Sequence, residues 1–307
     1  LLHAALQNMG IGWLGERASA MLAAISSSIL TLWMAKEWGF SRGDLRWLAL
    51  LLASWSFSLW NIPYSSWYAL PIALLGIRLF SKRPWMAGAT FALCFWFKQN
   101  IGLLSFSGAL LGALIYRSRG WSFRLAAGML AGLGIPFLGI LLFGGKAALL
   151  QSVAQIFFFP LRYPGLMGSA PSADVLAAPL TSLGLWVLSL YFVHAGVASK
   201  SVRLIQVGLF AYLSFYFLRK GWSFVEGGLF VLSVAAFLFS ILFCIASDEK
   251  SLRPRFFIFW LPAFGAFLQI YPRMDFQHFL FVFPLTAFLL VYFLSSMSRR
   301  YPTMPYL

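Results

Sequence analysis

Long runs of apolar residues, separated by short polar stretches, recur along the whole chain. A helix needs about 20 mostly apolar residues to cross the ~30 Å hydrocarbon core of a bilayer. These runs are continuous and rich in Leu, Ala and Phe, whereas the strands of a membrane barrel alternate over about ten residues. The pattern predicts an all-α, polytopic transmembrane helical bundle of eleven segments, at 18–35, 45–60, 64–80, 84–97, 101–116, 122–143, 179–198, 202–218, 224–246, 254–270 and 279–296.

The runs at 84–97 and 101–116 are short for full spans, so one long helix from 84 to 116 competes with a helical hairpin. The basic residues decide between the two. A hairpin with its tip at Lys98-Gln99-Asn100 places 16 of the 23 Lys and Arg residues on one side of the membrane. A continuous helix would put the clusters around Lys82 and Arg117 on opposite sides. We therefore predict the hairpin.

The cation-rich side is cytoplasmic by the positive-inside rule. The C-terminal tail from Arg299 is then inside and Leu1 is outside. Because the chain opens with neither a signal peptide nor an initiating Met, we expect at least one further helix and its loop before Leu1. The rest, 1–307, reads as a single transmembrane domain with a long outer loop at 144–178, whose Phe157–Pro160 run is expected to lie in the membrane interface.

Composition agrees with a membrane protein, since 61% of the residues are hydrophobic and 10% are charged. The net charge of +15 resembles that of a nucleic-acid-binding protein. However, most basic residues sit in short clusters between apolar runs, as orientation in a bilayer requires, so we expect no nucleic-acid partner. Cys94 and Cys244 lie in different apolar runs, and no metal-ligand spacing is present.

The stretch 271–279 places Arg273, Asp275 and His278 between two apolar runs. Ionisable groups are costly at membrane depth, so such a cluster is a candidate functional site. Asp275 and His278, three residues apart, would share one helix face, and Arg273 can present a planar fork to a phosphate. The alternative is that Asp275 caps the helix and Arg273 contacts lipid headgroups.

Two further cations are candidates for binding an anionic substrate. Lys98 lies at the hairpin tip, and Arg162 follows the Phe157–Pro160 run. An ammonium held below the membrane surface favours a neighbouring anion such as a lipid-linked phosphate. Alternatively, Lys98 extends its amine to the headgroups, and Arg162 only anchors a helix end.

All eight acidic residues fall at positions that the pattern assigns to loops. Ion-coupled transporters commonly place a carboxylate at mid-membrane to bind and release the ion. The pattern therefore disfavours a coupled transporter and leaves open an uncoupled flippase for lipid-linked saccharides. A membrane scaffold without a concave site is the third class.

Four stretches carry a resemblance to a known superfamily: Gly10–Arg17 (GIGWLGER), Phe97–Gly102 (FKQNIG), Phe159–Pro164 (FPLRYP) and Tyr271–His278 (YPRMDFQH). Together with the layout of nearly the whole chain, they resemble the GT-C integral-membrane glycosyltransferases, in particular protein O-mannosyltransferases and the aminoarabinose transferase. The resemblance implies transfer of a sugar from a polyprenyl-phosphate donor to a lipid, glycan or protein acceptor at the outer face of a bacterial inner membrane.

In that superfamily the catalytic base is an acidic residue in the first outer loop, which we expect upstream of Leu1. The resemblance then assigns Lys98, Arg162, Arg273, Asp275 and His278 to binding of the donor phosphate or the acceptor. It names no certain cofactor and leaves a divalent metal open. Fixed cations near the outer interface suit this chemistry, because negative charge develops on the lipid phosphate as the glycosidic bond breaks.

Overall fold

The computed structural model describes residues 12–56, 65–158, 173–194, 199–246, 252–270 and 276–300. The described residues form helices and short connections, with no strand among them. The helices are α2 (Gly12–Glu37), α3 (Arg42–Ser56), α4 (Ser65–Phe80), α5 (Pro84–Phe97), α6 (Gln99–Tyr116), α7 (Arg119–Val153), the π-helix η1 (Ala154–Phe158), α10 (Ala173–His194), α11 (Ser199–Lys220), α12 (Trp222–Ala246), α13 (Leu252–Phe267), the 3₁₀-helix η2 (Leu268–Ile270), α14 (Phe276–Leu280) and α15 (Phe283–Arg300).

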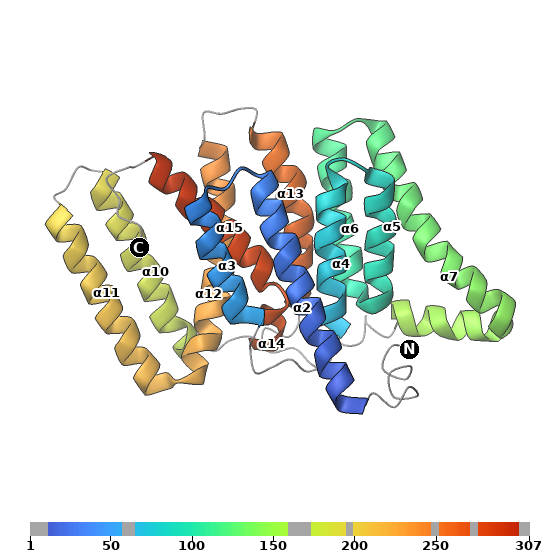
Figure 1. The fold of residues 1–307 in the computed structure, drawn as a ribbon, viewed down its shortest axis with the longest axis horizontal. Coiled ribbons are helices and arrows are strands. Elements are labelled where there is room, and N and C mark those ends of the chain that lie inside the picture. The colour runs from blue at the N-terminus through green and yellow to red at the C-terminus, as the bar shows by residue number, and fades with distance from the viewer. Residues whose placement is uncertain are drawn as a thin grey trace.

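The all-helical prediction is confirmed, and the long helices run up and down the bundle in alternation (Figure 1). Each of the eleven predicted segments overlaps a helix. The predicted hairpin is also present, because the backbone at Lys98 is extended (φ −150°, ψ 104°) and separates α5 from α6. Among the described residues, four helices are long and apolar enough to cross a membrane: Gly15–Glu37, Gln99–Tyr116, Arg119–Ile156 and Gly227–Ile245. Spanning by all eleven segments stays a prediction.

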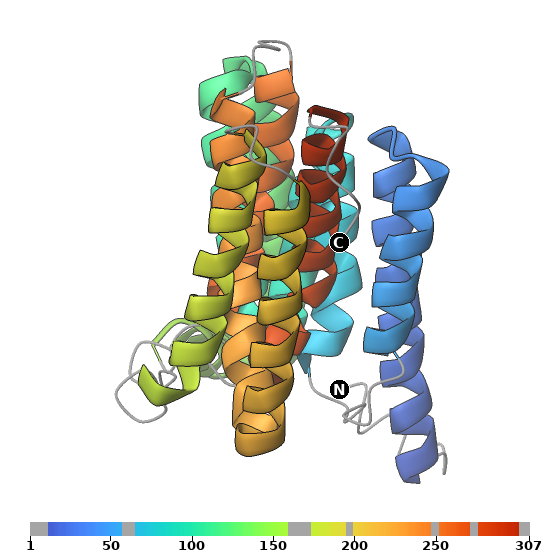
Figure 2. The same cartoon turned by 90° about the vertical axis from the view of Figure 1, so that its left-hand side faces the viewer.

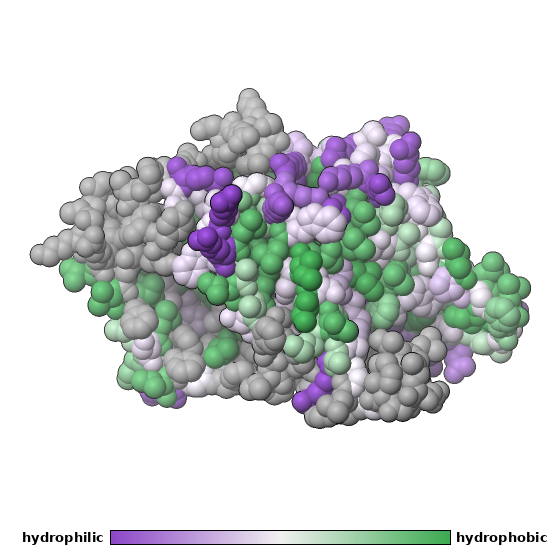
Figure 3. All heavy atoms as spheres, viewed as in Figure 1, coloured by the Kyte–Doolittle hydropathy of each residue, from purple (hydrophilic) through white to green (hydrophobic). Residues whose placement is uncertain are grey.

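Alternation of the helices sorts the charged residues between the two ends of the bundle. The α2–α3, α4–α5 and α6–α7 connections, the start of α13 and the end of α15 lie at one end, which we call the cation-rich end (Figure 1). Hydrophilic side chains line this edge above a hydrophobic band (Figure 3). The start of α2, the α5–α6 connection and α14 lie at the opposite, cation-poor end. The apolar band and the apolar helices indicate a membrane protein.

Helices α2 and α3 form a layer at one side of the bundle and pack against α4 and α15 (Figure 2). The contact is rich in aromatic rings. Trp38, just after α2, meets the rings of Phe259, Phe288 and Tyr292 edge-on, at centroid distances of 5.2, 5.6 and 5.7 Å. Edge-to-face pairs of this kind stabilise a core beyond their buried area. They fix the end of α2 against α13 and α15.

Small residues bring pairs of helix backbones close together, as is common between membrane helices. A Cβ added at Gly108 in α6 would collide with the carbonyl oxygen of Leu261 in α13. A Cβ at Gly128 in α7 would collide with the carbonyl of Trp85 in α5. These glycines therefore set the approach of α6 to α13 and of α7 to α5.

The prediction of a long loop at 144–178 is wrong for the part that the structure describes. Gly145 has a positive φ (φ 73°, ψ 179°), which bends α7 but does not end it. Favourable helix formers then continue α7 to Val153, η1 follows to Phe158, and α10 begins at Ala173. The part of α7 after the bend lies across the cation-poor end of the bundle (Figure 1). Residues 159–172 lie outside the described chain.

The packing at Gly108 gives a test of the α6–α13 contact. Gly108→Ala should destabilise the protein by about 1–3 kcal/mol, because the added methyl group has no space beside Leu261. Gly134→Ala in α7 is the matched control, since its Cβ would meet no atom within 4 Å. Thermal unfolding of the purified protein in detergent measures both variants. An equal Tm for the two would contradict the close packing of α6 on α13.

Candidate functional site

Lys98, the first predicted site residue, lies at the break between α5 and α6 at the cation-poor end. Its backbone N–H donates to the carbonyl oxygen of Cys94 at 2.9 Å, and its own carbonyl accepts from Gly102 N–H at 3.1 Å. The first bond is the last of α5, and the second is the first of α6. The side chain is half-buried, and burial lowers the pKa of Lys98 because desolvation opposes the charged form. A neighbouring anion would offset that cost.

A chain of polar and aromatic contacts connects the hairpin tip to α2. The ring of Phe97 lies 6.2 Å from that of Tyr68 in α4, measured between centroids. The Tyr68 hydroxyl and Ser19 Oγ share a hydrogen bond of 2.7 Å, and Ser19 Oγ donates to the carbonyl oxygen of Glu16 at 2.8 Å. Glu16 itself is only 5% exposed. The hydrophobic pattern predicts a loop at this position, but Glu16 is a buried carboxylate in the first turns of α2.

His278, in the short helix α14, lies at the same end of the bundle as Lys98 (Figure 1). The buried Gln269 of η2 donates from Nε2 to the carbonyl oxygen of His278 at 2.9 Å. Because η2 also contacts α6, it joins the His278 segment to the helix that starts at the hairpin tip. The structure thus brings Lys98 and His278 to one end. Arg162, Arg273 and Asp275 lie outside the described residues.

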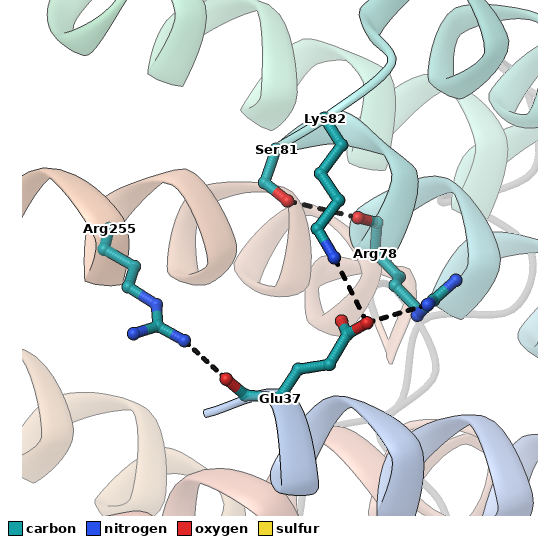
Figure 4. A network of polar contacts seen from close by, with 5 residues as sticks. All are labelled: Glu37, Arg78, Ser81, Lys82 and Arg255. Atoms are coloured by element: carbon teal, nitrogen blue, oxygen red, sulfur yellow. Dashed lines mark hydrogen bonds and ion pairs between the residues drawn. The ribbon is translucent and has the colours of Figure 1, made fainter. Parts of the chain in front are cut away.

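A second polar site, which the sequence pattern does not predict, lies at the cation-rich end, and Figure 4 shows its residues. Its centre is Glu37, the last residue of α2. Glu37 Oε1 accepts from Arg78 Nη2 at 2.7 Å and from Lys82 Nζ at 3.2 Å. Arg255 Nη2 in α13 donates to the backbone carbonyl of Glu37 at 2.7 Å. We call Glu37, Arg78, Lys82 and Arg255 the Glu37 cluster.

The cluster borders a cavity of about 510 Å³. Four cations and one carboxylate line it, together with apolar side chains from α2, α4 and α13 and the residue that follows α2. The lining residues are Met34, Glu37, Trp38, Ile77, Arg78, Ser81, Lys82, Arg117, Arg255, Ile258 and Phe259. The cavity therefore combines apolar walls with a surplus of positive charge.

Aromatic rings hold the guanidinium groups of this cavity in place. Arg78 lies 3.5 Å from the ring centroid of Trp33, and Arg255 lies 5.1 Å from that of Trp38. Cation–π contacts of this kind are worth about 0.5–1 kcal/mol at exposed sites and more where they are desolvated. These contacts hold the guanidinium groups of Arg78 and Arg255 against the rings.

The sequence contained one signal for the Glu37 cluster. Glu37, Arg78, Lys82 and Arg255 all lie on the side that the alternation of segments assigns as cation-rich. Because the four residues lie on one side of the membrane, they can be close together. However, the hydrophobic pattern of the sequence does not say which helices pack against one another. Asp44 lies on the same side, so the sequence does not single out Glu37 as the carboxylate that these cations contact.

The described residues contain no group of three or more His, Cys, Asp or Glu side chains that could hold a metal ion. Comparison with protein-family models, with curated proteins and with solved structures finds no match for the chain. A proposal of function for this chain therefore rests on the geometry of the two ends of the bundle.

The two cations on Glu37 Oε1 should contribute unequally to stability. Arg78 is 16% exposed and also stacks on Trp33, whereas the side chain of Lys82 is 66% exposed. Arg78→Ala should lower the free energy of unfolding by about 1–3 kcal/mol, because it removes a charged hydrogen bond and a ring contact. Lys82→Ala should cost less than about 1 kcal/mol, as exposed ion pairs do. Unfolding midpoints in detergent test the difference, and a larger effect at Lys82 would contradict it.

Proposed function

We propose that the protein is a membrane glycosyltransferase of the GT-C type. It moves a sugar from a polyprenyl-phosphate donor to a lipid, glycan or protein acceptor at the cation-poor end of the bundle. The observation that supports this proposal is the half-buried Lys98 at the break between α5 and α6, where burial disfavours its charge. An anionic ligand is the partner that such an ammonium group favours most.

The chemistry follows from the leaving group. When the bond between sugar and phosphate breaks, negative charge collects on the phosphate of the polyprenyl carrier. A cation held in position beside that phosphate stabilises the transition state more than the ground state. Lys98 has this role in the proposal, and Arg162, Arg273, Asp275 and His278 contribute to recognition of donor and acceptor.

The acceptor also has to lose a proton, and a carboxylate is a suitable base. The resemblance to the GT-C superfamily assigns that base to an acidic residue in the first outer loop. Within the described chain, Glu16 is a buried carboxylate at the same end of the bundle as Lys98. The variant Glu16→Gln distinguishes the two assignments. If sugar transfer is lost while donor affinity is retained, Glu16 is the base. If the variant is fully active, the base is another residue.

The distribution of charge between the two ends indicates how the protein is oriented in the membrane. The positive-inside rule places the cation-rich end and the C-terminal tail in the cytoplasm of a bacterial cell, and the cation-poor end outside its inner membrane. A polyprenyl-phosphate donor in that membrane can present its head group at the outer surface, where Lys98 would meet it.

An uncoupled flippase for lipid-linked saccharides is the alternative, because it also needs cations for phosphate. A flippase should line a path through the membrane with cations. In the described parts of the chain, every Lys and Arg lies within about two turns of a helix end. That distribution favours a reaction at one end over transport from end to end.

Purified full-length protein in detergent should transfer radiolabelled sugar from a polyprenyl-phosphate donor to the acceptor. A protein in detergent does not separate two compartments, and a flippase forms no glycosidic bond. A flippase would therefore give no glycosylated product under these conditions. Lys98→Ala should raise the donor KM and should lower kcat by a larger factor, about tenfold or more, since the lost charge contacts the phosphate most strongly in the transition state. Lys98→Arg should recover part of the affinity, because it restores the charge.

Lys146→Ala is the matched control for Lys98→Ala. Lys146 is an exposed lysine just after the bend in α7, at the same end of the bundle. It should leave the donor KM unchanged. Equal donor KM values for the Lys98→Ala and Lys146→Ala proteins would remove Lys98 from the donor site, and absence of any transfer would remove the enzyme assignment.

Cysteine labelling in intact cells tests the orientation. The native Cys94 and Cys244 are buried, so they give little background. A membrane-impermeant maleimide should label Lys146→Cys and should spare Arg119→Cys, which is exposed at the cation-rich end. Permeabilised cells should label both variants. The reverse pattern in intact cells would place the cation-rich end outside and would contradict the proposed site of reaction.

A further inference from the structure

The cavity beside the Glu37 cluster has no part in the proposed transfer reaction. Its lining includes Glu37, Arg78, Lys82 and Arg255 (Figure 4), which belong to the cation-rich end. Lys98 lies between α5 and α6, whose connection is at the opposite end (Figure 1). Orientation in the membrane explains why cations gather at this end, but it does not require them to surround a cavity. The cavity therefore needs its own explanation.

The charges that line the cavity are not balanced. Arg78, Lys82, Arg117 and Arg255 line it with Glu37 as the single carboxylate, which leaves a formal excess of three positive charges. Glu37 Oε1 accepts from both Arg78 and Lys82, while Arg255 reaches only the Glu37 backbone carbonyl. Arg117 makes no ion pair with any described residue and lies 4.9 Å from the Trp121 ring centroid.

One donor of the Glu37 cluster lacks a hydrogen-bond partner among the described residues. The Nε of Arg78 is buried and has no hydrogen-bond partner within the described part of the chain. A buried donor without a partner is unfavourable unless a ligand or water satisfies it. Guanidinium groups present several N–H donors in a planar fork that fits the oxygens of a phosphate. Three such groups and one ammonium line the same cavity.

The rest of the cavity is apolar. Met34, Trp38, Ile77, Ile258 and Phe259 form its walls, and Phe259 and Trp38 also belong to the aromatic core. The volume of about 510 Å³ falls within the ~300–1,000 Å³ that is typical of small-ligand sites. A ligand that fits has a phosphate for the cations and a further part for the apolar walls.

We propose that this cavity binds a phosphate ester at the cation-rich end of the bundle. The phosphate contacts Arg78, Lys82, Arg117 and Arg255, and the remainder of the ligand contacts the apolar walls. Two sources share this chemistry: the head group of an anionic phospholipid in the adjoining leaflet, and a soluble phosphate ester. The site does not depend on the proposed glycosyl transfer.

Two probes distinguish the sources. The soluble probe is glycerol 1-phosphate, titrated calorimetrically into purified full-length protein in detergent. The lipid probe is the protein reconstituted in vesicles of phosphatidylcholine alone or mixed equally with phosphatidylglycerol, with Tm as the measure of binding. Wild-type protein should bind glycerol 1-phosphate, or should gain Tm with phosphatidylglycerol, or both.

Two variants test whether the cavity is responsible. Arg117→Ala should weaken binding about tenfold, because one charged contact is lost and no ion pair is broken. Glu37→Gln should tighten binding several-fold, since it removes the one negative charge of the cavity and keeps an oxygen for Arg78 and Lys82. Arg119→Ala, an exposed cation that does not line the cavity, is the matched control and should match wild type.

The outcomes are distinct. Binding of the lipid probe alone supports the proposal and assigns the site to a head group, whereas binding of the soluble probe alone supports it and assigns a soluble ester. Binding of both supports the shared chemistry. The proposal is overturned if neither probe binds, if Arg117→Ala and Arg119→Ala bind equally, or if Glu37→Gln binds more weakly than wild type at an unchanged Tm. None of these results bears on sugar transfer.

Discussion

The cost of placing an ionised side chain in hydrocarbon is the constraint on which the rest of this structure depends. It confines the described Lys and Arg residues to the ends of helices and leaves an apolar band between them. Because successive helices alternate in direction, residues that are far apart in sequence meet at the same end. Glu37, Arg78 and Arg255 come from three different helices for this reason.

The same constraint gives the two ends different chemistry. At the cation-rich end the charges are many, and a single carboxylate and several aromatic rings hold them around a cavity. At the cation-poor end the charges are few. Lys98 is half-buried at a helix break, and Glu16 is buried at the same end in the first turns of α2. Many positioned cations suit tight binding of a phosphate, whereas a lone desolvated cation suits stabilisation of a charge that appears during a reaction.

The helices and the break at Lys98 could be predicted because they depend on local hydrophobicity and on a count of charges per side. The bend at Gly145 could not. Two adjacent glycines and a lysine resemble the end of a helix, and only the backbone shows that the chain resumes its helix after one residue of positive φ. The burial of Glu16 was also hidden, because it depends on how α2 packs against α4. Of the predicted site residues, Lys98 and His278 lie at the same end of the bundle. The cavity lined by cations could not be predicted, because sequence order does not say which helices pack against one another.

The most direct test is a cryo-electron microscopy map of the full-length protein in lipid nanodiscs with a non-hydrolysable analogue of a polyprenyl-phosphate sugar. The account predicts density for the analogue's phosphate beside the Lys98 amine, between the start of α6 and the α14 segment, at the end that also holds the start of α2. Density for that phosphate within the cavity of Arg78, Arg117 and Arg255, with none near Lys98, would contradict the assignment of the reaction to the cation-poor end.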